Sequence, residues 1–111
     1  MRRLQILVCD GPSCGLTYES DRLSALLRAR VAGDPGLRGR IHVVAYNCFG
    51  RCSEGPNMFV RELAAGEDGE AEPREVRGRG FYPGMDEAKV VEVLRRHAEE
   101  GRPVEAWVDD Y

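Results

Sequence analysis

The residues of this chain best suited to chemistry are its four cysteines, Cys9, Cys14, Cys48 and Cys52. They form a C-x4-C pair and a C-x3-C pair, with 33 residues between the two pairs. Thiolates are soft, anionic ligands, and four of them converging from two loops match what an iron–sulfur cluster requires. The spacing therefore favours a metal centre, and an iron–sulfur cluster in particular.

The spacing alone does not exclude three other roles for the four cysteines. Two disulfides would suit an oxidising compartment, whereas we expect a reducing one. A structural zinc site takes the same four thiolates, but zinc modules favour C-x2-C knuckles, and neither pair has that spacing. A thioredoxin-type thiol enzyme requires C-x-x-C at the start of a helix, which is also absent. The pattern favours a cluster over each alternative, with zinc the most serious competitor.

The second cysteine loop also carries residues suited to tuning a cluster. Gly50 allows the tight turn that lets backbone N–H groups approach a sulfur atom, and such contacts help to set a reduction potential. Arg51 lies between Cys48 and Cys52 and is placed by sequence to offset the negative charge of a cluster with four thiolates. We expect both residues to act on the cluster rather than to bind it.

Each cysteine pair follows an apolar segment with the composition of a strand. The first strand is predicted over residues 4–8 and the second, rich in β-branched residues, over 41–46. If these strands are neighbours, both pairs leave the same edge of the sheet. Two further strands are predicted over 57–63 and 75–82, separated by an acidic hairpin tip over 65–73 that we expect to be mobile.

Two helices are predicted from apolar residues that recur at helical spacing. The first covers about 20–31, and the second begins at its N-cap Asp86 and ends near Glu100, before Gly101. The resulting order β–α–β–β–β–α predicts an α+β fold with a four-stranded mixed sheet and two main helices. We expect the whole chain, 1–111, to be a single domain.

The composition excludes several classes of protein. The chain has 111 residues, 42% of them hydrophobic and 32% charged, as in an ordinary globular domain. A net charge of −3 gives no reason to expect nucleic acid binding, and no apolar run approaches the length of a membrane span. The apolar run after Arg2 and Arg3 is too short for a signal-peptide core, so we expect a cytoplasmic protein.

Several segments resemble the thioredoxin-like [2Fe–2S] ferredoxin family. Residues 48–60, CFGRCSEGPNMFV, are similar to the family's C-x-G-x-C-x-x-G-P segment, and residues 8–14, VCDGPSC, are similar to its first strand and cysteine loop. Residues 82–85, YPGM, followed by a helix and residues 97–104, HAEEGRPV, resemble its C-terminal signature. The small iron–sulfur subunit of respiratory NADH dehydrogenase carries a related domain with similar cysteine spacing.

The resemblance implies a thioredoxin-like fold and one [2Fe–2S] cluster near the surface that transfers one electron. It implies that the ligands are Cys9, Cys14, Cys48 and Cys52, and it points to a homodimer and to redox partner proteins. The loop between the first two cysteines is shorter than in some free ferredoxins of this group, and the acidic tip Glu67 to Glu72 matches no family motif.

The leading functional hypothesis is a one-electron carrier that is not an enzyme, because no acid–base pair or nucleophile accompanies the cysteines. The alternatives are a cluster-based redox sensor or assembly protein, and a zinc-stabilised interaction module. His97 lies on the apolar face of the second helix, so we expect it to pack or cap rather than to bind metal, and we assign His42 no role. Pro56 precedes a strand where thioredoxin folds often place a cis proline, and the sequence leaves its isomer open.

Overall fold

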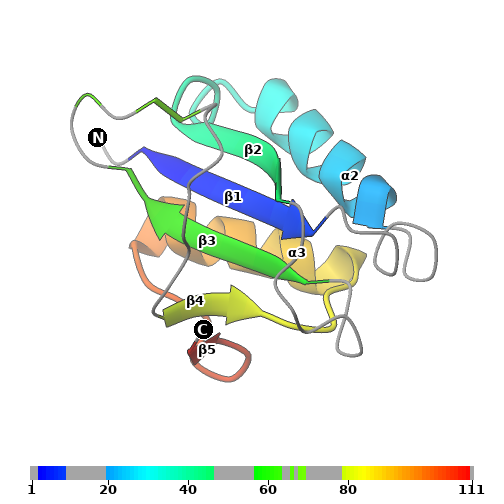
Figure 1. Cartoon of the computed structure of the whole chain (residues 1–111). Coiled ribbons are helices and arrows are strands. Elements are labelled where there is room, and N and C mark those ends of the chain that lie inside the picture. Colours follow the sequence, from blue (N-terminus) through cyan, green and yellow to red (C-terminus); the bar gives the residue numbers. More distant parts are fainter. Residues whose placement is uncertain are drawn as a thin grey trace.

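A computed structural model gives the fold of the chain (Figure 1) and describes residues 3–9, 20–46, 57–63, 66, 68–69 and 79–110. The strands are β1 (Leu4–Cys9), β2 (Ile41–Tyr46), β3 (Met58–Glu62), β4 (Arg79–Tyr82) and β5 (Asp109–Asp110). The helices are α2 (Ser20–Gly33), α3 (Glu87–Arg95) and the π-helix η2 (Arg96–Glu100). No helix among the described residues is long and apolar enough to cross a membrane.

The strands form one mixed sheet in the order β2–β1–β3–β4–β5 (Figure 1). β1 is parallel to β2 and antiparallel to β3, and the remaining pairs are antiparallel. The predicted α+β fold, with a four-stranded mixed sheet and two main helices, is confirmed, and the two-residue β5 extends the sheet. Two adjacent aspartates carry no strand pattern. β5 forms because a turn at Val104, which accepts from the N–H groups of Trp107 and Val108, returns the chain to β4.

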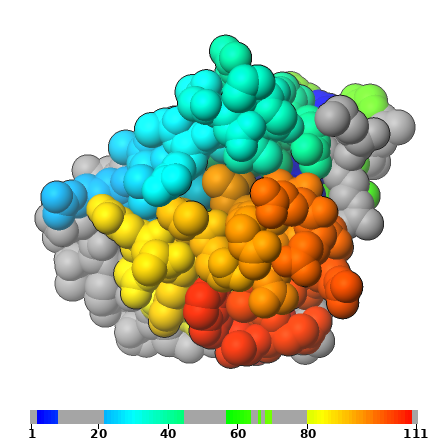
Figure 2. Space-filling model, turned by 180° about the vertical axis from the view of Figure 1, so that it is seen from behind, coloured from blue at the N-terminus to red at the C-terminus, as the bar shows by residue number. Residues whose placement is uncertain are grey.

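The helices pack side by side on one face of the sheet, as the view from behind in Figure 2 shows. Side chains alternate along β1, so Leu4, Ile6 and Val8 share the face that packs against the helices. The predicted apolar stripes are buried there: Leu23, Leu27 and Val31 of α2, and Val90, Val93 and Leu94 of α3. Each fully buried aliphatic side chain stabilises such a core by about 1.5–3 kcal/mol.

The second helix is capped as predicted but does not stay regular to its end. The carboxylate of Asp86 accepts from the backbone N–H of Lys89 at 2.8 Å, and Gly101 ends the helical segment in the left-handed region with φ of 66°. The last five residues form a π-turn instead of a continuous α-helix. This wider turn accompanies a contact 15 residues away in sequence, between His97 and Tyr82, which local propensity does not encode.

The predicted fourth strand, 75–82, is present over its described part, β4. Its Gly80 has φ of 151°, which favours glycine, and a Cβ there would overlap the carbonyl oxygen of Val60 on β3. In the sequence this glycine weakens the strand prediction, because glycine packs no side chain. In the structure it allows β4 to approach β3.

We predict that Gly80→Ala lowers the free energy of unfolding by about 1–3 kcal/mol, because the methyl group meets backbone and the φ value is unfavourable for alanine. Gly33→Ala is the matched control, since a Cβ at the end of α2 meets no atom within 4 Å. Urea denaturation of both variants measures the difference, and equal stability of the two variants would contradict the role assigned to Gly80.

Candidate functional site

The two cysteine-bearing connections leave the sheet at one edge. β1 ends at Cys9, and its parallel neighbour β2 ends at Tyr46, which pairs with Cys9 in the register of the two strands. Cys48 follows only two residues later, and two residues of chain span at most about 7 Å. The sequence left open whether these two strands are neighbours. In the structure they are, and their carboxyl ends lie side by side at one edge of the sheet.

The third strand begins at the same edge. β3 runs antiparallel to β1, and its first residue, Met58, pairs with Val8, one residue before Cys9. The connection from Tyr46 to Asn57, which carries Cys48 and Cys52, thus starts and ends on strands that flank β1. Asn57 is fully buried beside this edge. No role was predicted for this asparagine, although a polar residue directly before an apolar strand is a signal that can be read from sequence.

The structure describes the backbone of Cys9 but not its side chain. Cys14, Cys48 and Cys52 lie outside the described residues, as do Gly50, Arg51 and Pro56, so their predicted roles stay predictions. In the described part of the chain, no three histidine, cysteine, aspartate or glutamate side chains gather in a way that would hold a metal ion.

The sheet beneath this edge is apolar on both faces. On the helix side, Val8, Met58 and Tyr82 form a row across three strands and are at most 3% exposed. One residue further from the edge, Leu7, Phe59 and Phe81 form a second buried row on the opposite face. Loops that leave such a base are held at their ends by rigid packing, which suits the precise placement of ligands.

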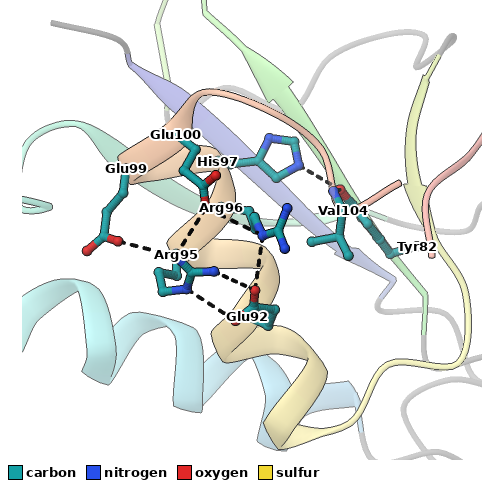
Figure 3. Close-up of polar contacts among 8 residues, drawn as sticks. All are labelled: Tyr82, Glu92, Arg95, Arg96, His97, Glu99, Glu100 and Val104. Atoms are coloured by element: carbon teal, nitrogen blue, oxygen red, sulfur yellow. Dashed lines mark hydrogen bonds and ion pairs between the residues drawn. The ribbon is translucent and has the colours of Figure 1, made fainter. Parts of the chain in front are cut away.

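His97 packs against Tyr82, in line with the predicted packing role, and it also forms a hydrogen bond that the sequence did not predict. Its Nε2 lies 2.7 Å from the hydroxyl oxygen of Tyr82, which also accepts from the backbone N–H of Val104 at 3.0 Å (Figure 3). The two rings meet edge to face at 86°. Tyr82 thereby ties β4, η2 and the segment before β5 together.

The exposed side of the α3–η2 junction carries a network of five charged side chains (Figure 3). Glu92 accepts from Arg95 at 2.6 Å and from Arg96 at 3.1 Å. These hydrogen bonds, first that from Arg95, hold the pKa of Glu92 below its ordinary value. Both arginines also pair with Glu100, at 3.1 Å and 3.5 Å, so the network links the last turn of α3 to the π-turn.

The face opposite the helices carries a polar cluster that was not predicted from the sequence. Gln5, fully buried on β1, donates to the carbonyl oxygen of Gly69 at 2.8 Å and accepts from Arg61 at 2.6 Å. A Cβ at Gly69 would overlap the imidazole of His42. Within the predicted tip, Gly66 and Asp68 are exposed, whereas Gly69 is buried on the sheet, which the sequence did not predict. The bonded residues are 64 and 56 positions apart, beyond the reach of local patterns.

Solved structures share this fold over nearly the whole chain. A thioredoxin-like [2Fe–2S] ferredoxin from Aquifex aeolicus matches with a TM-score of 0.73 and 19% identity, covering 99% of this chain and 94% of that one. Another structure of the wild-type protein gives 0.70 and 21%, with 97% of each chain covered. A cysteine-to-serine variant gives 0.70 and 20%, with 95% and 96% covered.

The fold is that of a thioredoxin-like [2Fe–2S] ferredoxin. The resemblance seen in the cysteine loops is thus confirmed at the level of fold, including the thioredoxin-like architecture that it implied. A scan against protein-family models finds no match to the chain, and a search of curated proteins finds none either.

We predict that Tyr82→Phe lowers the free energy of unfolding by about 1–3 kcal/mol, because it leaves the buried N–H of Val104 without its acceptor. His97→Ala should cost less, since His97 is partly exposed and the Tyr82 hydroxyl keeps its hydrogen bond from the N–H of Val104. Urea denaturation of both single variants and the double variant measures their coupling. If His97→Ala lowered the free energy of unfolding more than Tyr82→Phe, the Tyr82 hydroxyl would not have the structural role assigned to it here.

Proposed function

We propose that this chain is a one-electron carrier that binds a single [2Fe–2S] cluster through Cys9, Cys14, Cys48 and Cys52. The observation that carries the proposal is the parallel pairing of β1 with β2. It brings the end of β1 at Cys9 beside the end of β2, two residues before Cys48. Both cysteine loops therefore start from adjacent strand ends, as convergence on one small cluster requires.

The likeness to solved ferredoxins supports the same proposal. In four of the matching ferredoxin structures the likeness extends over 95% or more of this chain, so it is not confined to one strand–helix unit. Two of those structures are serine variants of cysteines four residues apart in the Aquifex protein. Cys48 and Cys52 are also four residues apart, and a shared spacing within a shared fold favours a shared ligand pair.

The protein's part in this function is to hold, shield and present the cluster. When bound, the cluster supplies the one-electron redox couple, and the chain needs no acid, base or nucleophile of its own. The buried rows of Val8, Met58 and Tyr82, and of Leu7, Phe59 and Phe81, exclude water beneath the edge. A ferredoxin of this kind is an electron carrier rather than an enzyme in its own right.

Protein purified without oxygen should be red-brown, with two irons and two sulfides per chain, and should bleach when one electron is added per chain. Cys14→Ser and Cys52→Ser should each lose or destabilise the cluster, because a ligand thiolate is removed. The loop variant Ser53→Ala is the control and should keep full iron and sulfide. Visible spectra and iron–sulfide determination make the comparison.

A colourless protein that resists reconstitution and holds one zinc would overturn the proposal and leave the zinc-stabilised module. Reversible reduction without loss of structure separates a carrier from the sensor or assembly protein, for which cluster loss should change binding to another protein. The homodimer and the cytoplasmic location stay predictions, which sedimentation and cell fractionation test.

Arg51→Ala should lower the reduction potential, because removing a cation beside the cluster destabilises the more negative, reduced state. Arg30→Ala is the matched control, since Arg30 is an exposed arginine on α2 rather than in a cysteine loop. Redox titration of both variants at one salt concentration gives the two potentials. An unchanged potential in Arg51→Ala refutes the tuning role.

A further inference from the structure

The two edges of the sheet differ in length. At one edge lies β5, which has two residues, and at the other lies β2, which has six (Figure 1). Among the described strands, β2 pairs only with β1. A strand of this length at an edge offers a row of backbone donors and acceptors to which a further strand can be added.

The ladder between β1 and β2 determines which backbone groups of β2 face outward. Leu4 donates to the carbonyl oxygen of Arg40 at 2.7 Å, and the register pairs Leu4 with Ile41. In a parallel ladder alternate residues bond to the partner, so the backbone groups of Val43 and Ala45 point away from β1. The outward N–H of Ile41 already donates to the carbonyl oxygen of Leu37 at 3.1 Å, and from Val43 onward no described strand pairs with the outer side of β2.

An arginine holds part of this edge through a weak contact. Arg28, exposed on α2, donates to the outward carbonyl oxygen of Val43 at 3.4 Å. That distance is long for an N–H···O bond, so little is lost when the guanidinium turns to another acceptor. Arg28 is therefore able to cover the edge in the free protein and to release it when an acceptor with a full negative charge arrives.

A cleft of about 320 Å³ opens along the same edge. Val31, Ile41 and Val43 give it an apolar wall, while Arg28 and Arg38 contribute two exposed guanidinium groups. None of its described lining residues is acidic. Such a cleft accepts an apolar side chain flanked by carboxylates.

The charge of this region is opposite to that of the whole protein. Between Ser20 and Tyr46 the chain has five arginines and two aspartates, whereas its net charge is −3. The Asp34 carboxylate accepts from the N–H of Gly36 at 2.8 Å within its own turn. A basic surface on an acidic protein orients an acidic partner toward that surface during encounter.

We propose that the outer edge of β2 is the docking site for the redox partner, which adds an extended, acidic segment as a sixth strand. The outward backbone groups of Val43 and Ala45 pair with this segment, and its carboxylates bind Arg28 and Arg38. The inference rests on the proposed carrier function, because it names the partner of that site. Two strand spacings of about 4.8 Å put the added strand about 10 Å from β1, whose last residue is Cys9.

The test uses the full chain as purified and a fluorescent peptide in which valine and glutamate take turns at every second position, with serine between them, so that both kinds of side chain share one face of the added strand. Fluorescence anisotropy measures binding, and NMR hydrogen exchange at the Val43 and Ala45 amides locates it. We expect protection of both amides, and we expect the peptide with lysine in place of glutamate to bind more weakly. Cluster content, taken from the spectrum of the same sample, reports separately on the carrier proposal.

Three variants separate strand addition from simple charge attraction. Val43→Pro removes the outward N–H at an edge position where proline is tolerated, and it should abolish amide protection at Ala45. Arg28→Glu should weaken binding about three- to tenfold, as expected for reversing one exposed charge contact. Arg30→Glu is the matched control, because Arg30 lies on the same helix but does not line this cleft. It should change affinity less than Arg28→Glu.

The proposal is overturned if the peptide does not bind, or if it binds without protecting Val43 and Ala45. It is also overturned if Arg30→Glu weakens binding as much as Arg28→Glu, since general charge then explains the affinity. If Val43→Pro fails to fold, strand addition is tested by the affinities of Arg28→Glu and Arg30→Glu together with hydrogen exchange at the Val43 and Ala45 amides. Concentration-dependent protection of these amides without peptide would make a second copy of this chain the occupant.

Discussion

The parallel pairing of β1 with β2 is the constraint on which the rest of this structure depends. A parallel pair cannot be joined by a tight turn, so the chain from Cys9 to Ile41 must cross back along the sheet, and α2 makes most of that return. The helix packs on one face through Leu23, Leu27 and Val31, whose burial stabilises the crossover. The same pairing brings the carboxyl ends of both strands to one edge, where the cysteine loops begin.

The other strands follow from this unit. β3 pairs with the free side of β1 and begins at the cysteine edge, so the second cysteine loop closes over a short distance. β4 then needs Gly80 to lie close to β3, and Tyr82 at its end anchors η2 and the segment before β5. The placement of the candidate site is therefore a property of the sheet order rather than of the loops alone.

Much of this arrangement is predictable from the sequence because it rests on local patterns. The apolar runs of β1 and β2, the stripe at Leu23 and Leu27, and the cap at Asp86 each arise from residues a few positions apart. What local patterns do not reach are contacts made by distant residues. Tyr82 bonds to His97 within the π-turn, and Gln5 bonds to the buried Gly69, 64 positions away. β5 depends on a turn that returns two aspartates to the sheet.

The sheet face away from the helices is polar at one end and mainly apolar at the other. The candidate site lies at the apolar end. Near the amino end of β1, Gln5 lies in register between His42 and Arg61, so that end is polar. Near Cys9 the same face is buried and apolar, with Leu7 and Phe59. Apart from the buried Asn57 at the cysteine edge, the described polar groups of this face, Gln5, His42 and Arg61, thus lie at the far end of the strand. A base that reorganises little would suit the one-electron site proposed above.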